Sequence, residues 1–431
     1  MDTEKSRVDD APADRAKRVA VVTMGVKLGD ETRGYTRFKV IAEMLADAGF
    51  EVDLVTSSFQ HWDKAQRDTT KPCYANLPYR VVFIDEPGYT KNLDLKRILS
   101  HRVAARNLRA HFAREFEEGR GYDLVYAEIP PNDVALACAE AACERNVPFV
   151  ADINDLWPEA MKMVLDIPLV SDAAFYPFSR DAKKTYRLLS AAVGTSDEYA
   201  ARPRADRETD YPHITVYVGN RIDEFDLGAR SRASEVAKPD GEVWVAYAGT
   251  LGASYDIATL VKAAAICATD ERTPETADGR TLRVKILGDG PDRQSLEELA
   301  RRLSAPVDFV GYAPYDLMAA YLCASDIVVN SLVKSAPQSI VTKIGDYLAS
   351  RSALVNTGSS PEMRALVESE GVGVNVEAQD PEALARALSD LARDDRARLE
   401  MAAKGRAVAL ERFDQATSYR AIVDMVRNLC R

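Results

Sequence analysis

The side chains best suited to chemistry lie in one short segment, residues 337–349, which reads P-Q-S-I-V-T-K-I-G-D-Y-L-A. Ser339 is a suitable N-cap, so we expect a helix whose free N–H groups attract an anion. Lys343 and Asp346 are three residues apart and therefore share one face of that helix. The lysine suits a diphosphate, and the carboxylate suits a ribose hydroxyl pair. The alternative is an ordinary salt bridge on a solvated face.

Glycine-containing turns follow three short apolar runs in the same half of the chain. Glycine permits positive φ and lets a phosphate approach the backbone closely. A single such turn is ordinary turn chemistry, but several in one domain favour a nucleotide site. The turns are Gly249-Thr250-Leu251-Gly252, Gly288-Asp289-Gly290-Pro291 and Gly311-Tyr312.

The elements that position these residues alternate between strand and helix, twice over. Such alternation predicts an α/β protein with two Rossmann-like, doubly wound parallel sheets, whose domains face each other across a cleft. Ligands bind beyond the carboxyl ends of strands in sheets of this kind, so we expect the site between the domains. The expected strands are 19–23, 51–56, 80–84, 124–127, 148–153, 191–194 and 214–218, followed by 243–248, 282–287, 308–310, 327–330, 353–355 and 372–376.

The domain boundaries follow from where this alternation stops and restarts. Residues 1–17 are a charged tail that we expect to be disordered, and 18–225 form the first domain. Residues 226–241 are polar without periodicity, which predicts a linker. Residues 242–410 form the second domain, which carries the glycine turns of the expected nucleotide site. We expect a last helix, 411–431, to pack back on the first domain.

Composition excludes several classes of protein. The net charge of −11 over 431 residues argues against nucleic-acid binding. There is no run of about eighteen apolar residues and no apolar leader, so we expect a cytoplasmic protein. Six cysteines without a C-x-x-C pair and four scattered histidines predict reduced thiols and no metal site.

Several segments resemble, in order, the motifs of family 4 of the retaining glycosyltransferases. The stretch ending in K-I-G-D-Y-L-A resembles that family's P-x-K-x-x-E-Y-L-A donor motif. The segments V-W-V-A-Y-A-G-T-L-G, I-L-G-D-G-P and F-V-G-Y resemble its donor-domain turns. D-I-N-D-L-W-P-E resembles the R-D-L-W-P-E segment of the polysaccharide and O-antigen branch, and T-V-Y-V-G-N-R-I-D resembles the hinge. These segments span 152–159, 215–223, 243–252, 286–291, 309–312 and 337–349.

The resemblance implies the GT-B fold, transfer from a nucleoside-diphosphate sugar to a glycan or lipid-linked acceptor, and chemistry without a metal or cofactor. It implies catalytic roles for Lys343 and Asp155. The expected donor-binding residues are Gly249, Thr250, Gly252, Gly288, Asp289, Gly311, Tyr312, Gln338, Ser339, Lys343 and Asp346. The expected acceptor-side residues are Gly34, Arg37, Asp155 and Glu159.

The chain departs from the family pattern at three places. The two usual glutamates, eight residues apart, are Gln338 and Asp346 here. The usual Arg and Lys after the first donor-domain strand are not evident, and the usual first-domain histidine is Asn154. These changes keep two alternatives open: a catalytically weak partner subunit, and a nucleotide-sugar 2-epimerase on the same fold. A nicotinamide dehydrogenase is disfavoured because no G-x-G-x-x-G follows the first strand.

Residues 91–114 form a basic segment with seven Lys or Arg and one Asp. A basic amphipathic helix can lie on an anionic inner leaflet, which predicts a peripheral location at the inner face of the cell membrane. The alternative is a helix docked on the sheet with a solvated basic face.

Overall fold

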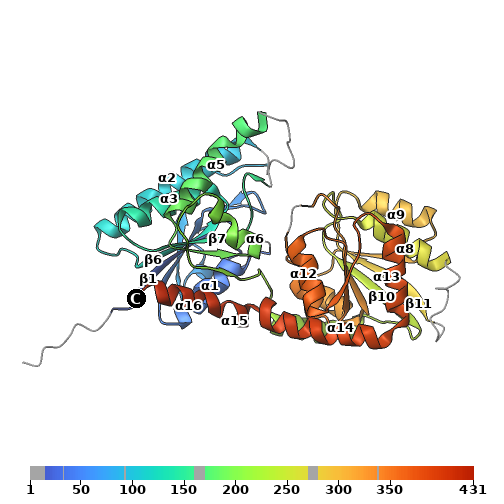
Figure 1. The fold of residues 1–431 in the computed structure, drawn as a ribbon. Helices are drawn as coiled ribbons and strands as arrows, with labels where there is room; N and C mark the ends of the chain where they lie inside the picture. The colour runs from blue at the N-terminus through green and yellow to red at the C-terminus, as the bar shows by residue number, and fades with distance from the viewer. Residues whose placement is uncertain (1–14, 33, 92–93, 160–169, 270–279, 337–338) are drawn as a thin grey trace, which may run out of the picture. The chain divides into compact units, whose positions relative to one another are not determined.

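A computed structural model describes residues 15–32, 34–91, 94–159, 170–269, 280–336 and 339–431 (Figure 1). It confirms the α/β class with two parallel sheets. The chain divides into two compact units. The first unit comprises Met1–Val193, Pro203–His213 and Ile422–Arg431, and the second comprises Gly194–Arg202 and Ile214–Ala421. A cleft between the domains remains a prediction, and the predicted tail 1–17 lies largely outside the described residues.

The first unit is built on a seven-stranded sheet in the order β5-β2-β1-β6-β7-β8-β9. Short apolar runs form its strands, and those in the middle are buried on both faces, as parallel strands are. The strands are β1 (Arg18–Val22), β2 (Glu51–Ser57), β5 (Arg80–Ile84), β6 (Leu124–Ile129), β7 (Phe149–Ile153), β8 (Ala191–Gly194) and β9 (His213–Thr215).

Helices cover both faces of this sheet. In Figure 1, α2 (Leu95–Glu117), α3 (Asn132–Glu144) and α5 (Val170–Leu188) lie on one face, while α1 (Arg37–Asp47) and α16 (Arg420–Leu429) lie on the other. The short strands β3 (Phe59–Gln60) and β4 (Ala65–Gln66) form a hairpin outside the sheet. We expected residues 411–431 on the first domain, and the grouping assigns Ile422–Arg431 to the first unit.

The second unit is built on a six-stranded parallel sheet in the order β12-β11-β10-β13-β14-β15. The side chains of β10 alternate between the two faces, so that Val243, Val245 and Tyr247 enter one core while Ala246 and Ala248 enter the other. The strands are β10 (Glu242–Ala248), β11 (Thr281–Leu287), β12 (Val307–Gly311), β13 (Ile327–Asn330), β14 (Ala353–Asn356) and β15 (Gly373–Asn375).

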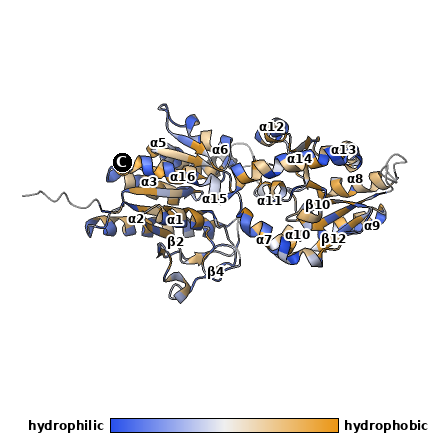
Figure 2. Ribbon diagram, turned by 90° about the horizontal axis from the view of Figure 1, so that it is seen from below, coloured by the Kyte–Doolittle hydropathy of each residue, from blue (hydrophilic) through white to orange (hydrophobic). Residues whose placement is uncertain are grey.

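Amphipathic helices complete the second unit, and Figure 2 shows hydrophilic residues on the outer sides of several of them. The helices are α7 (Ile222–Arg232), α8 (Ile257–Thr269), α9 (Arg293–Arg302), α10 (Tyr315–Ala324), α11 (Ile344–Ala349), α12 (Pro361–Glu370), α13 (Pro381–Arg393), α14 (Asp395–Val408) and α15 (Gln415–Ser418). Within the described ranges, no helix is long and apolar enough to cross a membrane.

The predicted linker at 226–241 is wrong for most of its length. Helix α7 occupies its first part, and a 3-10 turn at Ala233–Glu235 follows. Phe225 and Ala229 are buried in the core of the second unit, beneath an otherwise polar helix. Because few apolar residues mark the buried side of this helix and polar residues surround them, the sequence shows no clear helical periodicity.

Each sheet reverses its strand order once, and we call the carboxyl edge at that reversal a switch point. In the first sheet the chain runs from β1 outward to β2 and β5, then returns to β6 on the other side of β1. In the second sheet it runs from β10 to β11 and β12, then returns to β13. Loops leave in opposite directions at these two edges, which opens a space for ligands there.

Candidate functional site

The glycine turns of the second unit meet at the carboxyl ends of three neighbouring strands. The amide of Gly249 donates to Leu287 O at 2.9 Å, and that of Gly288 donates to Gly311 O at 2.7 Å. A Cβ at Gly288 would lie 1.9 Å from Gly249 O, and its φ of +131° also disfavours any side chain. Backbone therefore replaces side chains on this surface, where a phosphate could approach.

A second contact fixes the same turns to each other. The amide of Leu251 donates to Asp289 O at 3.0 Å, and a Cβ at Gly290 would lie 2.1 Å from Leu251 O. Gly252 lies beside Pro291, with 3.8 Å between its Cβ position and the proline ring. The structure thus brings the first two predicted turns into one rigid surface.

Lys343 reaches this surface from the loop that follows β13. Its Nζ is buried and has no hydrogen-bond partner among the described residues. The ammonium lies 4.2 Å from the ring centroid of Tyr247 and 4.0 Å from that of Tyr255. A Cβ at Gly249 would lie 2.7 Å from this nitrogen, so glycine leaves the space that the ammonium needs.

Burial lowers the pKa of Lys343 to about 7. The two tyrosine ring faces attract the ammonium and so offset part of the free-energy cost of burying its charge. They do not hydrogen-bond the ammonium as water or an anion would. The position of the lysine is fixed by Tyr347 on α11, whose hydroxyl receives a hydrogen bond from Ala248 N at 2.9 Å. A buried cation without a counter-ion, at the β10/β13 switch point, is the main electrostatic feature of the second unit.

Asp346 points to different partners. Its Oδ1 accepts from the Tyr315 hydroxyl at 2.6 Å and from Asn220 Nδ2 at 2.5 Å. Burial raises the pKa of Asp346 to about 6, although these two hydrogen bonds act in the opposite direction. No ion pair with Lys343 forms within the described chain, so the alternative of a solvated salt bridge between them is wrong.

The expectation that Ser339 caps the helix is also wrong. Helix α11 begins at Ile344 with Lys343 as its N-cap, because residues before it follow an irregular loop. Ser339 Oγ instead donates to Glu362 Oε2 at 2.9 Å. Gln338 lies outside the described residues.

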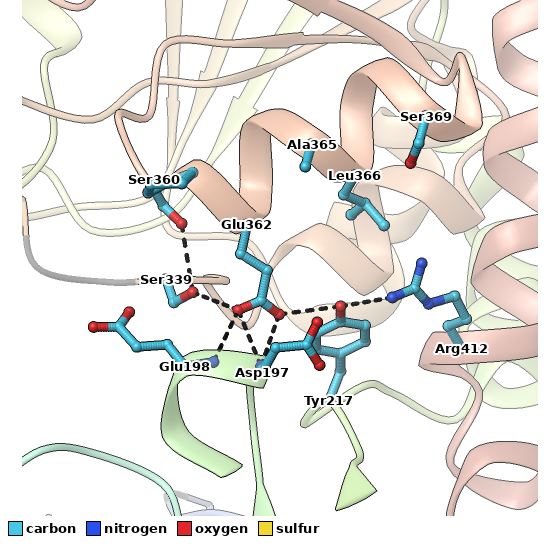
Figure 3. Close-up of a pocket in the computed structure, with 11 residues that line it drawn as sticks. Asp197, Glu198, Tyr217, Ser339, Ser360, Glu362, Ala365, Leu366, Ser369 and Arg412 are labelled. Carbon is cyan, nitrogen blue, oxygen red and sulfur yellow. Dashed lines mark hydrogen bonds between the residues drawn. The ribbon is translucent and has the colours of Figure 1, made fainter. Parts of the chain in front are cut away.

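Ser339 and Glu362 border a cavity of about 490 Å³, all of whose lining residues belong to the second unit (Figure 3). Glu362, in the first turn of α12, accepts from the amide of Asp197 at 3.0 Å and from the Tyr217 hydroxyl at 3.2 Å. Burial raises the pKa of Glu198, and the nearby Glu362 adds to that effect. Hydroxyl and carboxylate groups on such a surface can hydrogen-bond the hydroxyls of a sugar.

The carboxyl edge of the first sheet holds a buried carboxyl group instead of a cation. Glu128, near the end of β6, is 8% exposed. Its Oε2 accepts from Thr23 Oγ1 at 2.6 Å and from Met24 N at 3.2 Å, so it lies at the β1/β6 switch point. Burial raises the pKa of Glu128 to about 7, and nearby Asp152 contributes in the same direction.

The predicted acceptor-side residues have different surroundings. Arg37 is buried, and its Nε donates to Asp152 Oδ2 at 2.9 Å, so its guanidinium has a partner inside the first unit. Gly34 has φ of +130°, and its Cβ would lie 2.9 Å from Lys27 N, which indicates a steric role. Asp155 Oδ2 accepts from Trp157 Nε1 at 3.1 Å.

Burial raises the pKa of Asp155, whereas Glu159 is exposed at the end of a described range. Within the described chain, no three His, Cys, Asp or Glu side chains gather closely enough to hold a metal ion. The carboxyl edge of the second unit's sheet presents the Lys343 ammonium, whereas that of the first unit's sheet presents the Glu128 carboxyl group.

A family model described as glycosyl transferases group 1 matches residues 242–394. We refer to this matched segment as the group 1 domain. It includes β10 to β15, the glycine turns and Lys343. No curated protein sequence matches the chain.

Solved structures share the fold of the whole chain. Anabaena HepE in complex with UDP is 16% identical with a TM-score of 0.67, over 96% of this chain and 100% of that one. Sucrose-phosphate synthase from Thermosynechococcus elongatus is 16% identical with a TM-score of 0.66, over 96% and 99%. WaaG, a glycosyltransferase of lipopolysaccharide biosynthesis, is 13% identical with a TM-score of 0.59, over 95% and 99%. The chain has the GT-B fold, as predicted.

Three predicted donor residues lie at the surface of the second unit. Tyr312 is 82% exposed, and Thr250 is exposed while its carbonyl accepts from the Tyr247 hydroxyl at 2.8 Å. Asp289 is also exposed, 3.8 Å from Arg293. These side chains border the glycine turns. None of the hydrogen bonds or ion pairs of the described residues joins them to Lys343, so they do not cover its ammonium.

Sequence reasoning missed two residues at the strand ends. Arg293, the second residue after the G-D-G-P turn, places Nη1 3.0 Å from the Cβ position of Gly311. It is a basic group beside the glycine turns, although it follows β11 and not β10, the strand after which the family's usual Arg and Lys stand. Glu128 was also missed, although a glutamate inside the apolar run L-V-Y-A-E-I was a usable signal.

Proposed function

We propose that this chain is a glycosyltransferase that uses a nucleoside-diphosphate sugar and binds its diphosphate at the β10/β13 switch point. The observation that carries the proposal is the buried Lys343 ammonium without a counter-ion beside Gly249. An unpaired buried charge is costly, and an anion of the ligand removes that cost. The group 1 domain and the UDP in the HepE structure support the same ligand class.

In the proposed reaction the acceptor hydroxyl oxygen bonds to the anomeric carbon of the donor sugar while the bond from that carbon to the diphosphate oxygen breaks. The hydroxyl proton passes to the departing diphosphate, and the configuration is retained. Lys343 and the amides of the glycine turns stabilise the charge that develops on the leaving oxygen. Asp346 is held by Tyr315 and Asn220 close to the same loop and is available to a ribose hydroxyl through its second oxygen.

The finer parts of the proposal concern the acceptor and its location. We assign a glycan or lipid-linked acceptor in cell-surface polysaccharide assembly, with a cytoplasmic enzyme that needs no metal. Helix α2 supports contact with an anionic lipid surface. Leu95 and Leu99 are 76% and 58% exposed, and Arg102 and Arg106 continue the same outer face.

The predicted apolar stripe of that helix is divided between two faces. Leu108 and Phe112 are buried within the first unit, whereas Leu95 and Leu99 face outward. Arg97 packs over the rings of Tyr89 and Trp157 and belongs to the protein interior more than to the outer face. A lipid contact would therefore use the two exposed leucines and the arginines that follow them.

The deciding experiment measures the melting temperature with UDP and UDP-glucose, since a ligand that binds the folded state raises its stability. Wild type should be stabilised, and Lys343→Met should lose most of that shift. Lys404→Met is the matched control, because Lys404 is an exposed lysine of the same unit, paired with Glu400 at 2.7 Å. Absence of any shift across UDP, GDP, dTDP and CMP sugars would refute a nucleotide site.

A further inference from the structure

The guanidinium of Arg293 has unused hydrogen-bond donors at the carboxyl end of β12. Its Nε donates to Glu297 Oε1 at 2.8 Å, whereas Nη1 lies 3.8 Å from Asp289 Oδ2, which is too long for a hydrogen bond. Within the described chain, neither Nη1 nor Nη2 donates a hydrogen bond. The side chain is 32% exposed, so this edge of the guanidinium can meet a ligand.

A glycine fixes the surroundings of this guanidinium. A Cβ at Gly311 would lie 3.0 Å from Nη1 and 3.6 Å from Nη2 of Arg293, and the φ of +88° also disfavours a side chain at this position. The next residue along the chain, Tyr312, is 82% exposed. A hydrogen-bonding edge and an exposed aromatic ring therefore adjoin the same glycine turn.

The charge of Arg293 is offset by its neighbours, which distinguishes it from Lys343. The carboxylates of Glu297 and Asp289 both lie within 4 Å of the guanidinium, at 2.8 and 3.8 Å, so the three side chains together carry a net negative charge. Such a group offers hydrogen bonds but attracts a phosphate only weakly. In addition, β12 is two strands from β10 in the sheet, a separation of about 10 Å. A diphosphate at Lys343 therefore leaves Arg293 for another part of the nucleotide.

We infer that Arg293 selects the base of the donor nucleotide by donating from Nη1 and Nη2 to a carbonyl oxygen of the base, while the ring of Tyr312 packs on the plane of the base. A guanidinium has donors and no acceptor, so it pairs with O4 of uracil or thymine or with O6 of guanine. Cytosine and adenine have amino groups at these positions, which are donors as well and leave Arg293 unpaired. The inference rests on the proposed function, because it assumes that a nucleotide binds at this edge of the sheet.

Two variants separate the roles of the guanidinium and the ring. Arg293→Gln places an amide that both donates and accepts, so the affinity for UDP, dTDP and GDP should fall about tenfold while that for CDP and ADP stays the same or rises. Tyr312→Ala should lower the affinity for all of these nucleotides by similar factors, since every base has a face that packs on an aromatic ring. Arg302→Gln is the matched control, because Arg302 is an exposed arginine at the end of the same helix.

The test is calorimetric titration of the full chain with UDP, dTDP, GDP, CDP and ADP. Wild type and Arg302→Gln should bind at least one of the nucleotides with a carbonyl group about tenfold or more tightly than they bind CDP and ADP. Arg293→Gln should remove that preference, and Tyr312→Ala should keep it. Melting temperatures of the ligand-free variants show that each variant is folded.

Equal affinity of wild type for the two groups of nucleotides, or a preference that persists in Arg293→Gln, would overturn the inference. A uniform loss of affinity across all nucleotides in Arg293→Gln would overturn it as well, because it would place this residue on the diphosphate. In each of these cases nucleotides still bind, so the proposed donor site stands. If no nucleotide binds wild type, the donor site is refuted and the selection of a base with it.

Discussion

The β10/β13 switch point of the second unit and the β1/β6 switch point of the first occupy the same topological place in their sheets, yet they present opposite charges. One holds the Lys343 ammonium between two tyrosine rings. The other holds the Glu128 carboxyl group with one free oxygen. Topology therefore decides where a ligand can bind, whereas the loop residues decide which chemistry it meets.

The two edges also differ in how closely the backbone is packed. In the second unit a Cβ at Gly288 would meet a carbonyl oxygen at 1.9 Å. In the first unit a Cβ at Gly25 would meet only the edge of the Trp62 ring, at 3.2 Å. Bare backbone suits the compact, many-sided charge of a diphosphate, whereas rings and a carboxyl group suit a less charged ligand.

The largest effect should come from Gly288→Ala, which tests the packed backbone of the second unit. The clash with Gly249 O and the positive φ should together cost about 3 kcal/mol in the free energy of unfolding and abolish UDP binding. Gly241→Ala is the control, because Gly241 has φ of +85° but no atom within 4 Å of its Cβ position. Denaturant unfolding and calorimetric titration with UDP measure both effects. Equal losses in the two variants would assign the effect to φ alone.

Lys343→Met tests the cation itself. Turnover should fall about a hundredfold to a thousandfold, as when one preorganised donor to a transition-state charge is removed. The free energy of unfolding of the ligand-free protein should stay the same or rise, because a buried unpaired charge has been removed. Steady-state rates at saturating donor and chemical denaturation provide the two measurements. Loss of stability together with activity would instead make Lys343 a structural residue.

The pH dependence of nucleotide binding should sharpen the contrast further. Burial holds the pKa of Lys343 at about 7 in the free protein, and a bound diphosphate should raise it. The affinity for UDP should therefore fall as pH rises above 7, by up to about tenfold per pH unit until the pKa of the bound state is reached. Titration calorimetry between pH 6 and about 9 would show the trend, and Lys343→Met should abolish it. A flat profile in wild type would contradict a shifted lysine.

The smallest effect is expected at the membrane. Replacing Lys96, Arg102 and Arg106 with glutamine should weaken sedimentation with phosphatidylglycerol vesicles, each residue contributing about 1 kcal/mol, and added salt should weaken binding of wild type. UDP binding, which we assign to the other unit, should be unchanged. A wild type that ignores these vesicles would favour a soluble acceptor.

Much of the fold could be predicted because the hydrophobic periodicity of a strand or a helix is visible within a short stretch of sequence. Every expected strand has a counterpart, and the glycine turns lie at strand ends as expected. The helix α7 was missed because Phe225 and Ala229 become apolar contacts only once α10 lies beside them. The order of the family motifs also identified the fold, because each motif is a short continuous segment of the sequence.

The site was less predictable, since the role of a side chain depends on neighbours far away in sequence. Lys343 was found from its motif, but the two tyrosine rings around it come from another strand and loop. Arg37 was expected on the acceptor side, and the sequence did not show that its partner would be Asp152 on β7. Glu128 shows a further case: its place inside an apolar run was a usable signal, but its burial and its partners Thr23 and Met24 become visible only in the structure.

The assignment of Ile422–Arg431 to the first unit has a consequence for biosynthesis. The buried residues of α16, Ile422, Val423 and Val426, leave the ribosome after the whole of the second unit. The second unit ends at Ala421, so its whole sequence is available before the first unit is complete. Domains generally fold in the order of their synthesis. Here most of the first unit is synthesised before the second unit but stays incomplete until α16 has followed it, and a nascent first unit lacking α16 exposes apolar surface until then.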